Sequence, residues 1–472
     1  MDEKQLQAKL DEAVERLGVP GVAVGVLHEG VEHYAYAGVT SIENPLPVDE
    51  NTLFQFGSTG KTFTGTAIMR LVEEGKLELD APVRRYMPDL KLKDESAGEK
   101  VTVLQLLNHT AGWEGDLMED TGPGDDALAR YVDNMANLEQ VTPVGEGFSY
   151  NNASLSLAGR LIELVTGETY EAAMKRLVFE PLGLDHCFFF PTDIMTRRFV
   201  VGHNLHPDGK TTVARPWAMP RGNAPAGGIS SNAKDQIRWA RFHMGDGTAE
   251  DGTRFLSEEL LRRMQEPTIE ISGSALGDYV GISWMLRDID GTRVVGHGGT
   301  TNGQHSSFEM VPSRGFAVTS LSNSGPNGPQ LNTEIVRWAL EAYLGVQWKD
   351  PEPINADEAT LAEYVGTYDT IAVTCRVTPA DGRLQLAVEV KPEVRAQLQE
   401  AGEEQPEEDP PFVLGLLEDK DQYVVAEGPA KGMTGYFTRG TDGAVDGVHI
   451  GGRLAKRLPE GAPGAAEVLT QP

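Results

Sequence analysis

Apolar and polar positions alternate near both ends of the first 345 residues, whereas the stretch between them has helical periodicity. Residues 19–30 and 31–40 read as two strands joined at Gly30, and residues from about 80 to 225 read mainly as helices and loops. Further elements are predicted later in this part of the chain: strands at 279–286, 291–298, 306–312 and 315–323, and a helix over 331–345. The pattern predicts an α+β fold in which one antiparallel sheet is flanked by helices and carries an all-helical insert.

The character of the chain changes after residue 345. Residues 346–360 are acidic and rich in proline, as in a linker. From 361 to 460, short alternating segments with turns at Gly or Asp-Gly predict a small β-barrel, whose interior we expect side chains to fill. Residues 461–472 are predicted to be a disordered tail. The predicted organisation is therefore a domain over 1–345, a linker over 346–360, a barrel over 361–460 and the tail.

Ser58 and Lys61 lie three residues apart, where a Gly-flanked strand end becomes a long amphipathic helix. Residues at i and i+3 share one helix face, so the amine of Lys61 can reach the hydroxyl of Ser58 and take its proton. The N-terminal end of a helix also favours a developing alkoxide, and its unpaired N–H groups can stabilise an oxyanion. This segment predicts an activated serine nucleophile.

The same spacing also arises by chance, and the chain contains an example. Ser231 and Lys234 are three residues apart as well, but they read as the capped start of an ordinary surface helix. Further motifs are needed to support Ser58.

Two more motifs follow in order along the chain. Tyr150 and Asn152 come just before a predicted helix, and His297, Gly298 and Gly299 end a predicted strand. Ser-x-x-Lys, Tyr-x-Asn and His-x-Gly in this order resemble the penicillin-recognising, β-lactamase-related serine hydrolases: class C β-lactamases, D,D-peptidases, D-aminopeptidases and related esterases. The resemblance spans about residues 5 to 345. Residues 364–368 are similar to the opening of the lipocalin-like domains that some members carry, where they gate the cleft or mediate assembly.

The resemblance implies acyl transfer in two steps. Ser58 attacks a carbonyl carbon, Lys61 and Tyr150 relay its proton to the leaving group, and water then releases the acyl-enzyme. The amides of Ser58 and Thr300 hold the oxyanion. Asn152 holds a substrate amide and positions the lysine.

The Tyr150 segment leaves two questions open. We expect a nearby cation to lower the pKa of the Tyr150 phenol, which would suit it to carry protons. Taken alone, a tyrosine here is more often a packed aromatic side chain. Ser149-Tyr150-Asn151 also matches the Ser-x-Asn variant of the motif, and the alternative role of Asn152 is a helix cap.

The segment His297-Gly298-Gly299 stands where many relatives have Lys-Thr-Gly. Glycines let a substrate backbone approach the strand closely. A lysine there is a fixed positive charge that suits carboxylate-bearing substrates such as β-lactams, whereas histidine is mostly neutral at pH 7. Members with His-x-Gly resemble D-aminopeptidases, in which the histidine can donate a hydrogen bond to the intermediate or to the tyrosine. His28-Glu29-Gly30 also fits His-x-Gly but lies in a predicted turn.

We therefore predict a serine hydrolase that acts on amide or peptide bonds, including peptides with D-residues. A carboxylesterase or lactone hydrolase of the same family is the alternative. A β-lactamase, or a penicillin-binding sensor that is acylated without turnover, fits less well. An α/β-hydrolase is disfavoured because the Gly-x-Ser-x-Gly elbow is absent around Ser58.

The net charge of the chain indicates which classes of partner it can bind. With 41 basic and 71 acidic residues in 472, the formal net charge is −30, which disfavours nucleic acid and anionic membranes as partners. The predicted partners are a small-molecule or peptide substrate and a second copy of the chain.

The cysteines and histidines add little chemistry. Cys187 and Cys375 are the two cysteines, so no disulfide framework is implied. The first residues lack a signal-peptide pattern, so the expected compartment is the cytoplasm, or the periplasm or exterior if a leader has been removed. No metal or organic cofactor is predicted, since histidines such as His109 lack metal-site spacing. We expect His109 to fix a loop at the cleft.

Overall fold

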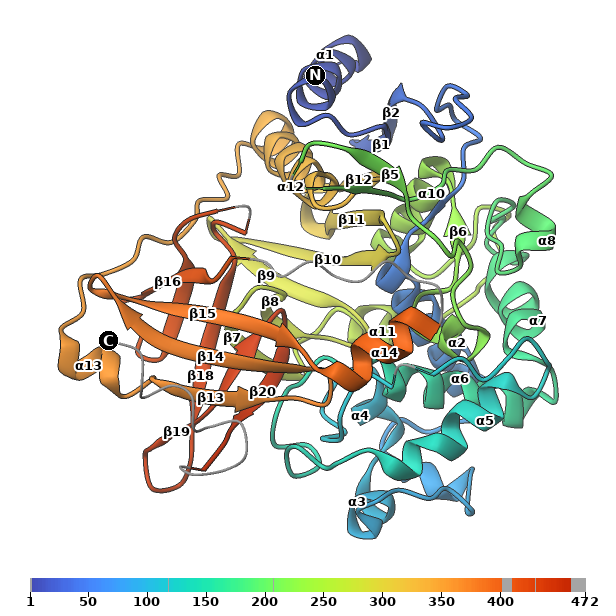
Figure 1. The fold of residues 1–472 in the computed structure, drawn as a ribbon. Helices are drawn as coiled ribbons and strands as arrows, with labels where there is room; N and C mark the ends of the chain where they lie inside the picture. The colour runs from blue at the N-terminus through green and yellow to red at the C-terminus, as the bar shows by residue number, and fades with distance from the viewer. Residues whose placement is uncertain (1, 118, 207, 401–409, 429, 460–472) are drawn as a thin grey trace.

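The computed structural model describes residues 2–459 except for 118, 207, 401–409 and 429. The predicted tail at 461–472 lies outside the described residues. An eight-stranded antiparallel sheet forms the centre of the first domain, in the strand order β2-β1-β12-β11-β10-β9-β8-β7 (Figure 1). Its strands are β1 (Gly21–His28), β2 (Val31–Gly38), β7 (Ile269–Ser274), β8 (Gly277–Val280), β9 (Met285–Ile289), β10 (Thr292–Thr301), β11 (Gln304–Val311) and β12 (Phe316–Ser322).

Helices cover both faces of this sheet, and most of them belong to the segment between β2 and β7. They are α1 (Glu3–Leu17), α2 (Gly60–Glu73), α3 (Glu95–Lys100), α4 (Val103–Leu107), α5 (Ala127–Asn134), α6 (Asn152–Thr166), α7 (Tyr170–Met174), α8 (Pro191–Ile194), α9 (Ala224–Gly227), α10 (Ala233–Met244), α11 (Glu258–Arg263) and α12 (Asn327–Ala339). Two short pairs, β3 (Phe54–Gln55) with β6 (Ser230–Ser231) and β4 (His203–Leu205) with β5 (Thr211–Val213), lie among them. Within the described part of the chain, the helices are too short or too polar to cross a lipid bilayer.

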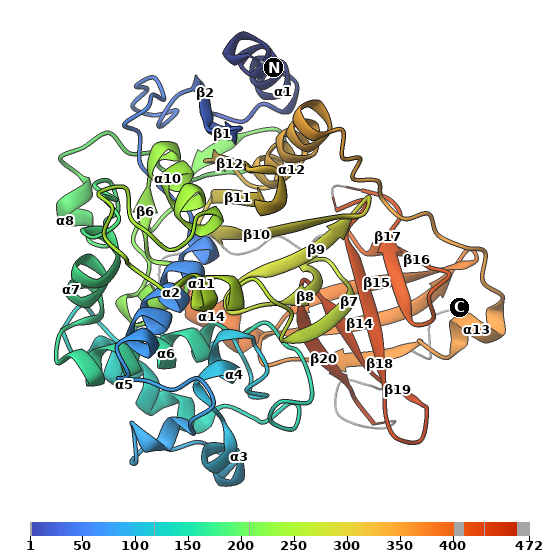
Figure 2. The ribbon, with the colours of Figure 1, turned by 180° about the vertical axis from the view of Figure 1, so that it is seen from behind.

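Alternating side chains of β1 fill two apolar cores. Val22, Val24 and Val26 pack with α1 and α12 on one face of the sheet. Ala23 and Leu27 belong to the larger core on the other face, which also contains side chains of α2, α6 and α10. The sheet is therefore a middle layer between helices, as Figures 1 and 2 show. This arrangement confirms the predicted fold class.

A closed eight-stranded barrel follows and lies beside the β7–β9 side of the sheet (Figure 2). Side chains such as Tyr368, Val377 and Leu384 are fully buried in its apolar core. The strands are β13 (Gly366–Asp369), β14 (Val373–Ala380), β15 (Arg383–Val390), β16 (Phe412–Leu416), β17 (Gln422–Val425), β18 (Thr434–Arg439), β19 (Val445–Ile450) and β20 (Arg453–Arg457).

Local details differ from the predicted pattern. The single strand predicted at 279–286 is wrong: β8 ends and β9 begins within it, because Ser283 between them has a φ of +59° that a strand residue does not adopt. Residues 345–357 contain no helix or strand, and the short helix α13 (Glu358–Ala362) leads into the barrel. A helix that the strand pattern did not predict, α14 (Pro392–Glu400), follows β15.

Candidate active site

Ser58 lies in a 3₁₀ turn, Gly57–Thr59, between β3 and α2. Gly57 has a φ of +56°, which a side chain would strain, and the turn brings the Ser58 hydroxyl to the start of the helix. Lys61 follows in the first turn of α2, and its Nζ donates a hydrogen bond to Ser58 Oγ at 3.0 Å. The structure therefore places the amine against the hydroxyl as the spacing predicts.

Lys61 is completely buried and held by three acceptors. Besides Ser58, its Nζ donates to Asn152 Oδ1 and to the carbonyl oxygen of Ala226, each at 2.7 Å. Burial lowers the pKa of Lys61 well below its usual value, and the charge of Arg453 lowers it further while Asp116 opposes the shift. In its neutral form the amine keeps two N–H groups, enough for Asn152 and Ala226, and its lone pair can accept the hydroxyl proton of Ser58.

The two asparagines after Tyr150 have different partners. Asn152 Oδ1 faces Lys61, whereas Asn151 Oδ1 accepts from the N–H of Ser154 at 2.8 Å and caps α6. The Nδ2 of Asn151 donates to the carbonyl oxygen of Trp113. The geometry thus fits Tyr-x-Asn, and Asn151 rather than Asn152 caps the helix.

Tyr150 lies next to Lys61, whose Nζ is 4.9 Å from the centre of the phenol ring. The expected lowering of its pKa is wrong. Burial raises the pKa of Tyr150 above its usual value, and this effect outweighs the opposing interactions with the Ser58 side chain and the Arg453 charge. Tyr150 is therefore a protonated phenol at neutral pH, suited to donate a proton.

The end of β10 forms a wall beside Ser58. A Cβ atom at Gly299 would lie 1.9 Å from the carbonyl oxygen of Phe56 and 2.6 Å from the backbone nitrogen of Ser58. A Cβ atom at Gly57 would lie 2.6 Å from the nitrogen of Thr300. Two backbones meet there at a distance that only glycine permits, so the amides of Ser58 and Thr300 lie close to each other. Gly298 faces more open space, where a Cβ atom would be 3.4 Å from its nearest neighbour.

His297 projects from β10 toward Tyr150, with 6.1 Å between the ring centroids. Its Nδ1 contacts the carbonyl oxygen of Gly298, and among the described residues its Nε2 has no hydrogen-bond partner. Burial, aided by the charge of Lys61, lowers the pKa of His297 to about 3. The imidazole is therefore neutral and supplies no fixed positive charge at this end of β10.

The two other matches to the motifs, one at Ser231 and Lys234 and one at His28 and Gly30, lie away from Ser58. Ser231 belongs to β6, and Asn232 caps α10 while Lys234 pairs with Glu50 at the surface. His28 ends β1 and packs edge-to-face against Tyr343, beside a turn in which Gly30 has a φ of +81°.

Two residues that sequence reasoning missed complete the site. Asp116 Oδ1 accepts a hydrogen bond from Asn152 Nδ2 at 2.7 Å, and both Asp116 oxygens accept from Arg453 of the barrel. Asp116 lies in an irregular loop and Arg453 follows it by more than three hundred residues, so neither periodicity nor spacing marks the pair. Among the described residues, no group of His, Cys, Asp or Glu side chains could hold a metal ion.

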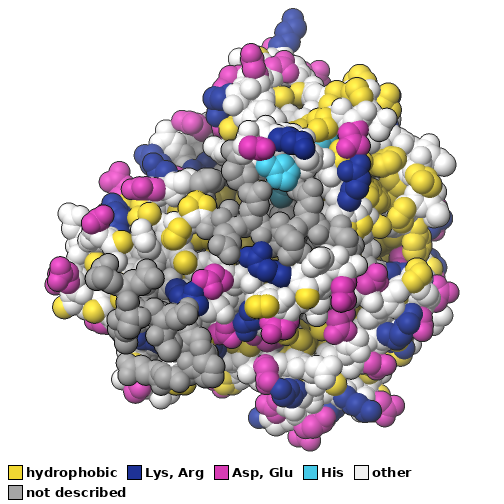
Figure 3. Space-filling model, viewed as in Figure 1, with side chains coloured by type: hydrophobic (Ala, Val, Ile, Leu, Met, Phe, Trp, Pro, Cys, Tyr) yellow, Lys and Arg dark blue, Asp and Glu magenta, His cyan; other side chains and the backbone are white. Residues whose placement is uncertain are grey.

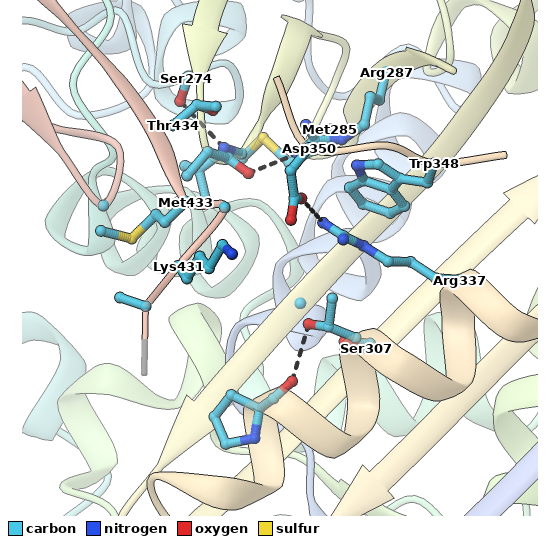
Figure 4. Close-up of a pocket in the computed structure, with 18 of the residues that line it drawn as sticks. Ser274, Met285, Arg287, Ser307, Arg337, Trp348, Asp350, Lys431, Met433 and Thr434 are labelled. Carbon is cyan, nitrogen blue, oxygen red and sulfur yellow. Dashed lines mark hydrogen bonds and ion pairs between the residues drawn. The ribbon is translucent and has the colours of Figure 1, made fainter. Parts of the chain in front are cut away.

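A cavity of about 2010 Å³ opens at Ser58, Tyr150 and His297. It continues between the sheet, α12, the segment after α12 and the barrel. Figure 4 shows its outer part, where Arg337 of α12 pairs with Asp350 at 2.6 Å. There the guanidinium of Arg287 lies 4.7 Å from the ring centre of Trp348. The site thus has an apolar and charged extension toward the barrel.

Figure 3 shows no single acidic patch among the side chains that it colours on this face. Acidic and basic side chains are interspersed there despite the formal net charge of −30.

Comparison with known proteins agrees with the geometry. The β-lactamase family model matches residues 6–342. Penicillin-binding protein 4 of Amycolatopsis lactamdurans is 34% identical over 376 residues, which cover 78% of this chain and 98% of that protein. The crystal structure of SurE with D-Leu is 27% identical, with a TM-score of 0.75, and covers 97% of this chain and 99% of that chain.

A third likeness concerns the fold alone. The octameric penicillin-binding protein homologue from Pyrococcus abyssi is 24% identical with a TM-score of 0.66, and covers 96% of this chain and 99% of that chain. The protein described here belongs to the β-lactamase family of serine hydrolases and penicillin-binding proteins, and it carries a C-terminal barrel.

Proposed function

We propose that the protein is a serine hydrolase that forms an acyl-enzyme on Ser58 and cleaves amide or peptide bonds, including those of peptides with D-residues. The observation that carries this proposal is the 3.0 Å hydrogen bond between the buried Lys61 amine and Ser58 Oγ. Because burial favours the neutral amine, Lys61 can remove the Ser58 proton as the hydroxyl attacks a carbonyl carbon. The Ser58 oxygen–carbon bond forms, and a tetrahedral intermediate results.

The remaining groups act on that intermediate. The amides of Ser58 and Thr300 stabilise its oxyanion, and Asn152 keeps the lysine in place. The carbon–nitrogen bond breaks as Tyr150, protonated at neutral pH, gives a proton to the leaving amine, and Tyr150 then recovers a proton from Lys61. Water then attacks the acyl-enzyme by the reverse proton relay and releases the product.

Three observations support a peptide substrate. The neutral His297 gives no fixed charge for a β-lactam carboxylate, and the neighbouring Arg453 is already paired with Asp116. A cavity of about 2010 Å³ exceeds the roughly 300–1,000 Å³ that a small ligand usually fills, so it suits an extended chain. The similarity to SurE, solved with D-Leu, covers both domains and supports a D-residue in the substrate.

Substrate profiling tests this proposal. The purified protein is assayed with nitrophenyl esters, L- and D-aminoacyl anilides and a chromogenic cephalosporin, with Ser58→Ala as the control. We expect turnover of anilides, with a preference for D-residues, and weak cephalosporin hydrolysis. Turnover of esters alone would favour the carboxylesterase alternative, and product that stops at one equivalent per chain would favour a sensor. Self-association of the chain remains a prediction, which light scattering measures directly.

A further inference from the structure

The last hairpin of the barrel reaches into the hydrolase site. Its strands, β19 and β20, are joined at Gly451 and Gly452, with φ values of +55° and +82°. The carbonyl oxygen of Gly452 accepts a hydrogen bond from the N–H of Tyr150 at 2.9 Å. The N–H of Leu454 donates to Ser149 Oγ at 3.2 Å. The hairpin is thus fixed to the turn that carries Tyr150.

Arg453, at the start of β20, extends from this hairpin to Asp116. Its Nη2 lies 3.1 Å from Asp116 Oδ1, and its Nε donates to Asp116 Oδ2, so the guanidinium holds both carboxylate oxygens. The guanidinium carbon is also 5.2 Å from the centre of the Tyr150 ring. One side chain of the barrel therefore contacts two parts of the hydrolase site.

Asp116 is linked to Lys61 through the side chain of Asn152. Asp116 Oδ1 accepts a hydrogen bond from Asn152 Nδ2 at 2.7 Å. This bond fixes the orientation of the Asn152 amide, so that its oxygen Oδ1 faces Lys61. That oxygen accepts from Lys61 Nζ at 2.7 Å, and the same Nζ donates to Ser58 Oγ. A continuous chain of hydrogen bonds joins the barrel arginine to the serine. A rotated Asn152 amide would present N–H groups to Lys61 and break this chain.

We propose that Arg453 is a positioning residue for the acylation step: through Asp116 and Asn152 it holds the Lys61 amine against Ser58, so that the hydrolase site is complete only with the barrel docked. This inference rests on the proposed function and adds to it a role for the barrel. It assigns the barrel's last hairpin to catalysis rather than to substrate binding alone.

The charges around Lys61 predict the direction in which its pKa changes when Arg453 or Asp116 is replaced. Five titratable groups face Lys61. Tyr150 comes from its own turn, His109 from the loop after α4, and His297 from β10. Asp116 comes from the loop after Trp113, and Arg453 from β20. Burial keeps both histidines neutral and the tyrosine protonated. Of these five groups, Asp116 and Arg453 therefore carry a charge at neutral pH. Arg453 lowers and Asp116 raises the pKa of Lys61.

The test is the pH dependence of acylation, measured as kcat/KM for a nitrophenyl ester. Activity falls as pH drops through the pKa of Lys61, because the protonated amine is no base. We call the low-pH part of the profile, where activity falls, the acid limb. In Arg453→Met we expect the acid limb to move to higher pH by about one unit and kcat/KM at pH 7 to fall at least tenfold. In Asp116→Asn we expect the limb to move to lower pH, with a lower plateau because the Asn152 amide loses its anchor. Arg453→Lys should recover part of the activity.

A matched control exists within the barrel. Arg439 holds the carboxylate of Asp421 with hydrogen bonds of 2.9, 3.0 and 2.7 Å, in a similar bidentate pair away from Ser58. Arg439→Met should leave the acid limb in place. Circular dichroism monitors folding, and if Arg453→Met does not fold, Arg453→Lys and Asp116→Asn decide the question.

Two failures can be told apart. A wild-type protein that no ester or fluorophosphonate acylates would contradict the proposed function itself. A wild-type protein that is acylated, with folded Arg453 and Asp116 variants whose acid limbs coincide with that of the wild type, would overturn this inference alone.

Discussion

The imidazole of His109 stacks on the phenol ring of Tyr150, with 4.5 Å between the ring centroids. Its Nδ1 also accepts a hydrogen bond from the backbone N–H of Asn151 at 3.0 Å. His109 itself has a φ of +63°, so its loop is held in an unusual conformation while it supports the turn opposite. One buried side chain thus fixes both the ring and the backbone of the Tyr150 segment.

Replacement of His109 should weaken this support. In His109→Ala the buried N–H of Asn151 loses its acceptor and Tyr150 loses the ring beneath it, which should cost about 1–3 kcal/mol of stability and lower kcat. His109→Asn should cost less, since asparagine tolerates a positive φ and offers an acceptor oxygen. Urea unfolding and ester hydrolysis measure both effects. Equal stability of His109→Ala and the wild type would rule out this role.

The pH profile of kcat/KM should reflect the two shifted groups. The pKa of Lys61 is lowered, so the active neutral amine is present above that pKa and activity is lost as pH falls through it. The pKa of Tyr150 is raised, so its proton stays in place at alkaline pH and we expect no loss of activity up to about pH 9. Ester hydrolysis between pH 5 and 9.5 tests both limbs. A rate that still rises tenfold per pH unit at pH 9.5 would show an unshifted lysine.

Neighbouring glycines of β10 should respond differently to alanine. Gly299→Ala places a Cβ atom 1.9 Å from the Phe56 carbonyl oxygen, so the backbone must move and the oxyanion site with it. We expect a loss of kcat of roughly a hundredfold or more, the usual effect of removing an oxyanion donor. Gly298→Ala, whose Cβ atom has space, should retain most of the activity. Similar losses in the two variants would contradict the proposed arrangement.

Glu309 should make stability depend on pH. It lies opposite Gly296 across the β10–β11 pair, and burial raises its pKa to about 7, against the opposing charge of Arg287. A carboxyl whose folded-state pKa is raised contributes stability that is present below its ordinary pKa and is lost as pH rises through 7. Glu309→Gln should therefore be more stable than the wild type at pH 8 by about 2–3 kcal/mol, and equal to it near pH 4.5. Thermal unfolding at both pH values measures the difference, and parallel curves would refute it.

Patterns local in sequence predicted much of this architecture. The alternation in β1 and β2 shows which side chains enter each core, and Ser58-x-x-Lys61 predicts its own geometry because one helical turn joins the two residues. The split between β8 and β9 escaped prediction, since a positive φ at Ser283 has no mark in an apolar run. The pKa of Tyr150 also needed the structure, because burial is a property of the packed core.

The parts of the site that sequence could not predict depend on the docking of two domains. Asp116 and Arg453 meet because the barrel closes onto the hydrolase domain, and no spacing relates a loop residue to one in the last hairpin. The choice between Asn151 and Asn152 likewise required the start of α6 in three dimensions. Long-range placement of polar side chains is what the sequence pattern leaves undetermined.

The central claim is that Ser58 carries the acyl group, and mass spectrometry of the trapped protein tests it most directly. After incubation with a fluorophosphonate, we expect one adduct per chain on the peptide that contains Ser58, lost in Ser58→Ala and kept in Ser231→Ala. An unmodified wild-type chain, or an adduct on the peptide that contains Ser231, would contradict the account.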